Sequence, residues 1–359
     1  MITDVRPARV GIVGCGDVTN LYLPGTAPFP SIELAACADL DGERAAALSA
    51  RGGFPAVSPE ELLADSTIEV VLVLTPPAAH AAVSRAAIAA GKHVYSEKPL
   101  AATRQDAATI LSEAAAASVR VGAAPDTFLG RGLQTARSLI DEGAIGTPLA
   151  ASGCVAHPGP EVWHPNPGIF YGPGGGPLLD LGPYYVTALV NMLGPIVAVS
   201  AVGRGVGSER RIGRGPFAGS TVTASVPTTV IATLGFASGA VGGLTASFDA
   251  VGTMAPHLEV HGTAGSLSLG DPNEFDGAVR YRPLGAKEWE DVPLRDAGGV
   301  GRGIGLADMI AAIRTDRPHR ASGELAFHVL DVLLAIESAA TTHGSELVAS
   351  RVERPAPLA

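Results

Sequence analysis

Two side chains that can exchange a proton lie close together in the stretch GGGPLLDLGPYY, residues 174–185. Asp180 and Tyr184 are four residues apart, so they share one face if a helix begins near Asp180. A tyrosine hydroxyl has an ordinary pKa of about 10, so it needs a neighbouring cation to act as a base near neutrality. The preceding glycines let the backbone approach a ligand without side chains in the way. An alternative is a pair of half-buried aromatics, Tyr184 and Tyr185, at a helix start.

Lys98 is the candidate for that cation. It follows a predicted strand over His93–Ser96 and precedes Pro99, which stiffens the chain at the strand end. An ammonium held there can hydrogen-bond a reacting oxygen and stabilise negative charge that develops on it. We therefore expect Tyr184 to exchange a hydroxyl proton, Lys98 to assist electrostatically, and Asp180 to orient the substrate and the lysine.

A glycine-rich turn near the N-terminus predicts the element that binds a cofactor beside these groups. The apolar strand Val10–Val13 runs into Gly14-x-Gly16-x-x-Thr19, where backbone N–H groups at a helix start can bind a pyrophosphate. Gly14 allows the tight turn, and Gly16 removes a side chain that would meet the phosphates. Thr19 stands where a third glycine is usual.

A second predicted strand ends at Asp39, 23 residues after Gly16, which is close to the spacing of the acidic residue that binds the adenosine ribose. A carboxylate there repels a 2′-phosphate, so NAD is favoured over NADP. The alternative is that Asp39 caps the next helix, a function that Asp41 can also serve.

Further apolar runs, over Val70–Leu74 and residues 119–125, alternate with predicted helices and indicate a parallel sheet covered on both faces. Ligands bind at the carboxyl ends of such strands. Together with Gly14, Gly16, Asp39 and Lys98, the expected cofactor-binding residues are Asp17, Val18, Thr75, Pro76, His80 and Glu97.

From about residue 126 the pattern changes. A predicted helix over Arg131–Glu142 is followed by short strands, with a turn at Ser238-Gly239 between two of them, and the chain ends with helices over Leu306–Thr315 and Glu324–Thr342. We expect two domains, a dinucleotide-binding domain over residues 1–125 and a substrate-binding and oligomerisation domain over residues 126–359.

Composition narrows the function classes. The chain of 359 residues is 47% hydrophobic, carries a formal net charge of −10 and has no basic block, so a nucleic-acid surface is not expected. The three cysteines, Cys15, Cys37 and Cys154, follow no disulfide or metal pattern and fit a reducing compartment. No apolar run reaches membrane length without Gly, Pro or a charge. These features predict a cytoplasmic protein.

Three segments, GIVGCGDVTN, TPPAAHAAVSRAAIAAGKHVYSEKPLA and GGGPLLDLGPYY, resemble the Gfo/Idh/MocA family of glucose–fructose oxidoreductases and inositol dehydrogenases. The resemblance covers almost the whole chain. It implies an α/β protein: a Rossmann domain with a doubly wound parallel sheet, then an α/β domain with an open, largely antiparallel sheet. It also implies NAD(P)-dependent oxidation of a secondary alcohol, or reduction of the ketone, on a sugar, sugar derivative or cyclitol.

The same resemblance matches Lys98 to the family's catalytic lysine and implies a cis bond before Pro99. Most members have histidine at the position of Tyr184, so this chain resembles a tyrosine-containing branch. The alternatives are an enzyme that retains NAD and oxidises its substrate transiently, as an epimerase or eliminating glycosidase does, and a dinucleotide-sensing regulator. Intact Lys98, Asp180 and Tyr184 count against the regulator.

The segment after the fifth strand offers candidates for substrate binding, since an indole suits C–H bonds and polar tips suit hydroxyls. Local packing is the alternative for each one. His157 and His164 match no familiar zinc spacing, so no metal is expected. The apolar face of an open sheet predicts a homodimer or homotetramer. The substrate-binding candidates are Asp126, Trp163, His164, Asn166 and Tyr171.

Overall fold

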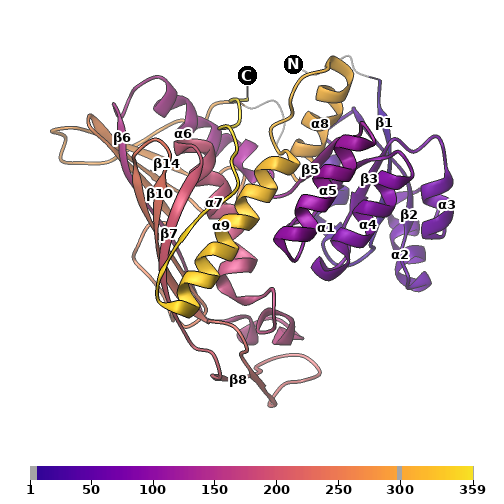
Figure 1. Cartoon of the computed structure of the whole chain (residues 1–359), viewed down its shortest axis with the longest axis horizontal. Helices are drawn as coiled ribbons and strands as arrows, with labels where there is room; N and C mark the ends of the chain where they lie inside the picture. The colour runs from indigo at the N-terminus through magenta and orange to yellow at the C-terminus, as the bar shows by residue number, and fades with distance from the viewer. Residues whose placement is uncertain (1–5, 297–300, 359) are drawn as a thin grey trace. The chain divides into compact units, whose positions relative to one another are not determined.

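A computed structural model describes residues 6–296 and 301–358, and the chain divides into two compact units (Figure 1). The first unit runs to Gly130 and also takes up Asp296–Leu330. The second unit contains Arg131–Arg295 and Asp331–Pro357. Residues 1–5, 297–300 and 359, which belong to the expected domain ranges 1–125 and 126–359, lie outside the described residues.

The first unit contains a sheet of five parallel strands in the order β2-β1-β3-β4-β5. The strand order reverses between β1 and β3, and ligands of such sheets bind at the carboxyl ends of the strands beside that reversal. All of β3 is buried, as a sheet covered on both faces requires. The strands are β1 (Ala8–Val13), β2 (Ile32–Ala38), β3 (Val70–Val73), β4 (His93–Ser96) and β5 (Val121–Ala123).

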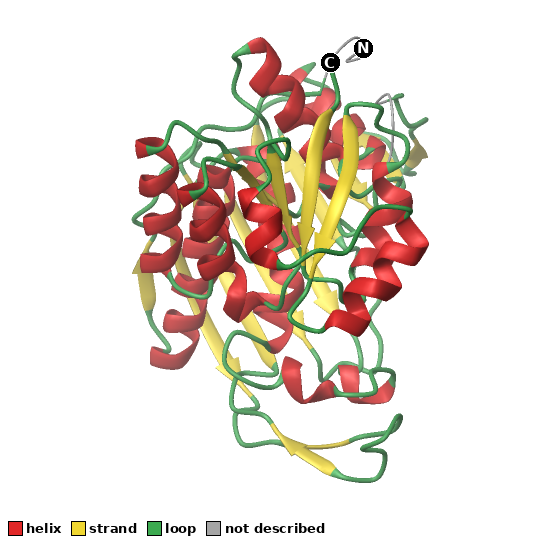
Figure 2. Ribbon diagram, turned by 90° about the vertical axis from the view of Figure 1, so that its right-hand side faces the viewer, coloured by secondary structure: helices red, strands yellow, loops and turns green. Residues whose placement is uncertain are grey.

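Helices lie on both sides of these strands (Figure 2). Local signals define where these helices begin and end. Asp41 accepts hydrogen bonds from the first backbone N–H groups of α2, and Gly53 ends α2 in the left-handed region. Ser58 and Glu61 form a capping box at the start of α3. The helices are α1 (Thr19–Thr26), α2 (Gly42–Gly52), α3 (Pro59–Ala64), α4 (Pro77–Ala89), α5 (Arg104–Ala116) and α8 (Ile304–Thr315), with a 3-10 turn at Thr127–Leu129.

Helix α8 departs from the expected arrangement of two consecutive domains, because it packs within the first unit. The carboxylate of Asp126 accepts hydrogen bonds from the backbone N–H groups of Gly303 and Gly305, at the start of α8. Near its other end, Arg314 forms an ion pair with Glu69. The helix thus lies in the first compact unit, and the expected domain boundaries and functions stay predictions.

The second unit contains an open sheet of nine strands in the order β15-β14-β13-β12-β6-β11-β10-β7-β16. All neighbours are antiparallel except β6 and β11. The expected open, largely antiparallel sheet is confirmed. The strands are β6 (Pro148–Ala156), β7 (Ile196–Arg204), β10 (Thr229–Phe236), β11 (Val241–Ser247), β12 (Leu258–Gly262), β13 (Gly265–Leu269), β14 (Val279–Pro283), β15 (Glu290–Asp291) and β16 (Ser345–Leu347).

One face of this sheet is covered by helices and the other is not. Burial alternates along β10, where Val230, Ala232 and Leu234 are buried and Ile231 is 58% exposed. Figure 1 shows α7 and α9 alongside these strands. A separate two-stranded arm stands apart from the sheet. The helices are α6 (Arg131–Asp141), α7 (Gly176–Leu193) and α9 (Gly323–Thr342), with 3-10 turns at Pro160–Val162 and Pro167–Phe170, and the arm contains β8 (Glu209–Arg211) and β9 (Thr221–Thr223).

Among the described residues, α9 is the one helix that is long and apolar enough to cross a membrane by length and composition. Of its apolar window, 61% is buried inside the protein. A core helix of a soluble protein passes the same test, so this helix is weak evidence for a membrane span.

Candidate active site

The glycine-rich turn after β1 has two glycines with different reasons for being glycine. Gly14 has φ +100°, and a Cβ there would lie 2.5 Å from the backbone nitrogen of Thr75, at the end of β3. Apart from Gly16 itself and its two chain neighbours, the described residues place no atom within 4 Å of the position that a Cβ of Gly16 would occupy. Gly14 is therefore required by the protein itself, whereas Gly16 borders open space that a Cβ would partly fill.

Helix α1 begins directly beyond this open space. The hydroxyl of Thr19 donates to the carbonyl oxygen of Gly16 at 2.7 Å, and Thr19 is 1% exposed, so threonine fits where a third glycine is usual. Asp17 is exposed and Val18 is half-buried. The N–H groups of Thr19, Asn20 and Leu21 already donate to carbonyl oxygens three residues earlier. The donors expected to bind an anion are therefore the N–H groups of residues 16–18, just before the helix.

Asp39 and Asp41 divide two functions between them. Asp41 caps α2, accepting from the N–H groups of Glu43 and Arg44. Asp39 accepts instead from the N–H of Cys15 at 2.7 Å and from that of Asp41 at 2.9 Å. Its half-buried carboxylate therefore lies against the glycine-rich turn, where the ribose role requires it.

These features fit a dinucleotide. The glycine-rich turn, the start of α1 and the Asp39 carboxylate are contiguous, and open space borders Gly16. Thr75, at the end of β3, has a buried hydroxyl oxygen for which the described residues offer no hydrogen-bond partner. Its neighbour Pro76 is exposed at the start of α4. Donors and space thus occur together at the point where the strand order reverses.

His80 links two of the turns at this edge of the sheet. Its Nδ1 lies 2.6 Å from the carbonyl oxygen of Pro99, and its Nε2 lies 2.8 Å from that of Thr75. The side chain is 1% exposed, so His80 positions these turns, and its expected contact with the cofactor stays a prediction. The Lys98–Pro99 peptide bond is cis.

Glu97 also acts through protein groups. One carboxylate oxygen accepts from the hydroxyl of Tyr22 on α1 and the other from the N–H of Lys98, both at 2.9 Å. Glu97 is 7% exposed, and its expected direct contact with the cofactor stays a prediction. It joins α1, which follows the glycine-rich turn, to the backbone that carries the half-buried Lys98.

In the second unit, Asp180 and Tyr184 lie on α7, which begins at Gly176, four residues before Asp180. The four-residue spacing places both on one face of this helix. Asp180 is half-buried and Tyr184 is 6% exposed. Lys98 belongs to the first unit, so the convergence of its ammonium with these two side chains stays a prediction.

A cavity of about 390 Å³ in the second unit includes Asp180 in its wall. Trp163, which was expected to contact substrate, lines the same cavity and is 51% exposed. The ring centroid of Trp163 lies 5.3 Å from that of His164, which is half-buried beside it, and Asn166 is exposed. The lining residues are His157, Pro160, Trp163, Asp180, Leu181, Phe248 and Asn273.

Two of the expected substrate contacts are buried and engaged elsewhere. Asp126 is 0% exposed and caps α8, and burial raises the pKa of its carboxyl. Tyr171 is 1% exposed and donates its hydroxyl to Glu161, and burial together with this bond raises the pKa of the phenol. One carboxylate oxygen of Asp126 has no hydrogen-bond partner among the described residues. Both side chains are buried, and contact of either one with a substrate stays a prediction.

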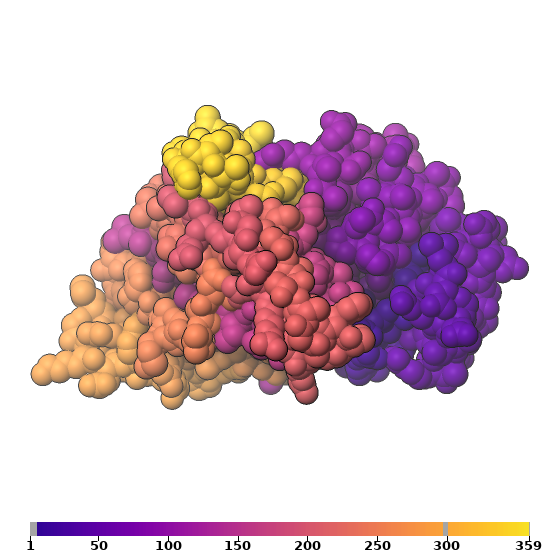
Figure 3. All heavy atoms as spheres, turned by 90° about the horizontal axis from the view of Figure 1, so that it is seen from below, coloured from indigo at the N-terminus to yellow at the C-terminus, as the bar shows by residue number. Residues whose placement is uncertain are grey.

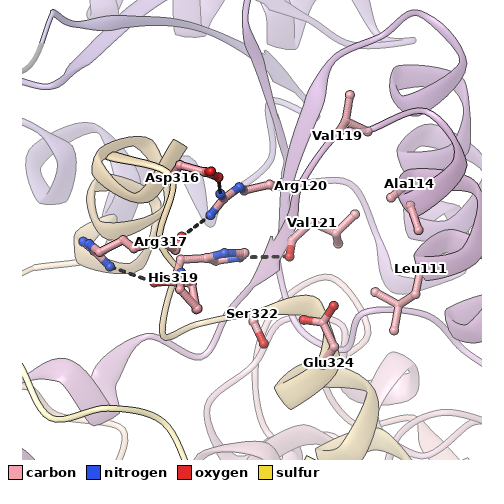
Figure 4. Close-up of a pocket in the computed structure, with 12 residues that line it drawn as sticks. Leu111, Ala114, Val119, Arg120, Val121, Asp316, Arg317, His319, Ser322 and Glu324 are labelled. Carbon is pink, nitrogen blue, oxygen red and sulfur yellow. Dashed lines mark hydrogen bonds and ion pairs between the residues drawn. The ribbon is translucent and has the colours of Figure 1, made fainter. Parts of the chain in front are cut away.

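The larger cavity, about 490 Å³, lies elsewhere in the first unit, between α5, β5 and the segment that joins α8 to α9 (Figure 4). There Arg120 pairs with Asp316, and Nε2 of His319 lies 3.0 Å from the carbonyl oxygen of Val121. Val119 and Arg120 precede β5, so this cavity is at the amino end of a strand. The predicted cofactor residues follow the carboxyl ends.

Metal-ligating and thiol groups add little to the site. Within residues 6–296 and 301–358, no three His, Cys, Asp or Glu side chains are grouped as a metal ion would need. Cys15, Cys37 and Cys154 are free thiols. Burial raises the pKa of the Cys15 thiol to about 12, so it is not a reactive nucleophile.

Sequence reasoning missed several residues around the cavity. Phe248 and Asn273 follow strands of the open sheet, and no local pattern marks them as lining residues. His157 was weighed only as a metal ligand. Arg210, which contacts the carboxylate of Glu161 beside the cavity wall, is one of many arginines, and its partners lie far away in sequence.

A parallel dinucleotide-binding sheet followed by an open antiparallel sheet defines a class of oxidoreductase. The oxidoreductase family with an NAD-binding Rossmann fold matches residues 8–124, and the GFO/IDH/MocA C-terminal domain matches residues 133–268. The chain belongs to the Gfo/Idh/MocA family of NAD-binding oxidoreductases. Membership in the tyrosine-containing branch stays a prediction.

Relatives in this family include sugar reductases. The dTDP-3,4-didehydro-2,6-dideoxy-alpha-D-glucose 3-reductase of Streptomyces violaceoruber is 35% identical over 195 residues, 53% of this chain and 56% of the relative. The enzyme of the same name from Streptomyces antibioticus is 31% identical over 232 residues, 64% of this chain and 68% of the relative. The chain thus spans between half and just over two thirds of the length of these relatives.

Solved structures match the fold over nearly the whole chain. Levoglucosan dehydrogenase in complex with NADH and levoglucosan has a TM-score of 0.82 and 24% identity, with 96% of this chain and 100% of that chain covered. At this identity the likeness shows the fold alone.

Proposed function

We propose that this protein is an NAD-dependent dehydrogenase or reductase that transfers a hydride between nicotinamide and a secondary alcohol or ketone of a sugar, sugar derivative or cyclitol. The observation that carries the proposal is the glycine-rich turn at the strand-order reversal, with Asp39 bound to its backbone and open space beside Gly16. The names of the relatives, two dideoxyglucose reductases and a levoglucosan dehydrogenase, support a sugar as the substrate.

The cofactor would be held by residues of the first unit. The N–H groups at the start of α1, including those of Asp17 and Val18, would bind the pyrophosphate. The carboxylate of Asp39, which lies against the glycine-rich turn, would accept from ribose hydroxyls. The carboxylate disfavours a 2′-phosphate, which supports NAD over NADP. When bound, the nicotinamide supplies the two-electron redox chemistry, by accepting or returning a hydride.

The proton chemistry falls to three residues of this chain. In the oxidation direction the ionised Tyr184 side chain, a phenolate, accepts the proton of the substrate hydroxyl and becomes a phenol. The ammonium of Lys98 hydrogen-bonds the substrate oxygen and stabilises the negative charge that develops on it. Asp180, in the wall of the 390 Å³ cavity, orients the substrate and the lysine. Glu97 and His80 hold the backbone that carries Lys98.

Substitution of Lys98 and Tyr184 tests these roles. Lys98→Ala and Tyr184→Phe should each lower kcat at least about a hundredfold, the size typical of acid–base groups, with little change in the Kd for NADH measured by fluorescence. Lys287→Ala, at an exposed lysine, is the matched control. Turnover of a broad panel of sugars, glycosides and inositols by both variants at the rate of the unsubstituted protein would remove the proposed roles.

Oligomeric state, compartment and cofactor retention belong to the same proposal. The uncovered face of the nine-stranded sheet, with Val202 and Ile231 about 60% and 58% exposed, supports a homodimer or homotetramer. Three free cysteines support a cytoplasmic location. Nicotinamide absorbance that survives dialysis of the purified protein would favour an enzyme that retains NAD through transient oxidation of its substrate.

A further inference from the structure

The cavity that Asp180 lines has mostly apolar walls. Four lining side chains are apolar, namely those of Pro160, Trp163, Leu181 and Phe248, while His157, Asp180 and Asn273 are polar. A hydroxyl pressed against an apolar wall loses its hydrogen bonds to water without replacement. A ring that carries a hydroxyl on every carbon therefore fits this cavity less well than a ring with one bare edge.

Arg210 contacts both segments that contribute the apolar wall of Pro160, Trp163 and Phe248. Its guanidinium donates to the carboxylate of Glu161 at 2.9 Å and to the backbone carbonyl oxygen of Phe248 at 2.7 Å. Glu161 lies in the same turn as Pro160 and precedes Trp163 by two residues. One guanidinium thus joins the two segments that form the wall.

Further contacts fix the position of this guanidinium. It forms an ion pair with Asp249 at 2.5 Å, and Asp249 in turn accepts from the hydroxyls of Thr228 and Thr229. The guanidinium carbon of Arg210 also lies 5.7 Å from the ring centroid of Tyr171, whose hydroxyl donates to Glu161. These acceptors lie in fixed directions around the guanidinium. The planar fork of arginine donors suits such an arrangement, and the compact ammonium of lysine does not.

Arg210 extends from the outer arm formed by β8 and β9. The arm is at the surface of the protein (Figure 3), and most of its residues are exposed, but the side chain of Arg210 is only 16% exposed. Desolvation offsets much of the attraction in a buried ion pair, so this network adds little to overall stability. Its effect is to set the position of the wall.

We infer that Arg210 is a positioning residue that holds the wall of Pro160, Trp163 and Phe248 as a selective surface, and that the substrate is a sugar with an edge lacking hydroxyls. Deoxy sugars, anhydro sugars and glycosides have such an edge. The inference rests on the proposed function and narrows its substrate class.

Matched sugar pairs test the substrate class. We would measure kcat/KM with NAD for D-galactose against 6-deoxy-D-galactose, and for D-glucose against its 1,6-anhydride. The deoxy or anhydro member should be favoured at least about tenfold, equivalent to about 1.4 kcal/mol. Equal values within both pairs would overturn the inference and leave the proposed oxidoreductase function standing. Lack of turnover of every sugar, glycoside and inositol with either cofactor would overturn both.

Arg210→Met tests the positioning role. It should reduce the preference within each pair at least about fivefold, chiefly by raising KM for the preferred member, and leave the Kd for NADH unchanged. Arg210→Lys, which keeps the charge but not the fork of donors, should restore only part of the preference. Arg280→Met is the control, since Arg280 is 60% exposed and pairs with Asp291 on the same sheet.

Trp163→Ala covers the case in which Arg210→Met fails to fold. Trp163 is 51% exposed, so its removal should leave the melting temperature near that of the unsubstituted protein while the preference within each pair falls. A folded Arg210→Met with an unchanged preference would refute the positioning role. An unchanged preference in Trp163→Ala would refute the selective wall.

Discussion

Alanine at Gly14 and at Gly16 should have opposite effects, although the two glycines are two residues apart. The Gly14 backbone has φ +100°, which L-residues rarely adopt, and a Cβ there would lie 2.5 Å from the Thr75 nitrogen and 2.6 Å from the Leu74 carbonyl carbon. Backbone atoms at the end of a buried strand cannot move aside as a flexible side chain can. At Gly16 the same atom would meet no atom of the described residues within 4 Å beyond the glycine and its two chain neighbours.

The magnitudes follow from these contacts. A non-glycine residue in the left-handed region costs about 1–3 kcal/mol, and an overpacked atom adds about 1–3 kcal/mol. Gly14→Ala should therefore lose about 2–6 kcal/mol of the free energy of unfolding, a large share of the 5–15 kcal/mol typical of a domain, with a fall in Tm of at least about 4 °C. Gly16→Ala should stay within about 1 kcal/mol of the original protein.

Cofactor affinity should be lowered by the substitution at Gly16, which leaves stability nearly unchanged. An added methyl group at Gly16 occupies space that the pyrophosphate needs, so the Kd for NADH should rise at least about tenfold, or about 1.4 kcal/mol. The assay is a thermal melt of each variant by circular dichroism, together with a fluorescence titration of NADH at a temperature where all variants are folded. The Asp39 contact with the Cys15 N–H should survive in Gly16→Ala, since the turn itself is not strained.

Either of two outcomes would refute the reasoning about this turn. If Gly16→Ala bound NADH as tightly as the unsubstituted protein and melted at the same temperature, the open space beside Gly16 would have no function in cofactor binding. If Gly14→Ala melted normally, the approach of this turn to the end of β3 would be looser than the 2.5 Å contact indicates.

Two further predictions concern single side chains. Asp39→Ala should raise the ratio of kcat/KM with NADP to that with NAD, because a carboxylate that repels the 2′-phosphate is removed; an unchanged ratio would argue against the ribose role. Burial lowers the pKa of His319, so below about pH 6.5 the unfolded chain binds more protons than the folded one, and stability should fall as the pH falls from there. In His319→Gln the free energy of unfolding, measured with urea, should depend less on pH between pH 7 and pH 5 than in the unsubstituted protein. His343→Gln, at an exposed histidine, is the control. The same pH dependence in His319→Gln and in the unsubstituted protein would contradict the assignment.

Local patterns were enough to predict the cofactor half of the site. The strand, the glycine-rich turn and the start of α1 are consecutive in the chain, and the carboxylate of Asp39 ends the adjacent strand, so sequence spacing alone brings them together. The division of labour between Asp39 and Asp41 was also predictable, because capping needs only the next few N–H groups.

The sequence could not tell a direct contact from a supporting one. Glu97 and His80 stand in the expected positions, yet their polar atoms are used by Tyr22, Lys98, Thr75 and Pro99 within the protein. The same spacing would suit either role. The burial and the hydrogen-bond partners of these two side chains depend on how strands β3 and β4 and helix α1 pack.

Residue types and spacing along the chain determined the fold class, the cofactor turn and the placement of Asp180 and Tyr184 on one helical face, because each depends on neighbours a few residues away. The tertiary structure decided the rest. Asp126 became a helix cap through residues 177 and 179 positions away, and Arg210 reached Glu161 across 49 residues. Such contacts follow from packing between distant segments, and no local periodicity records which distant groups will meet.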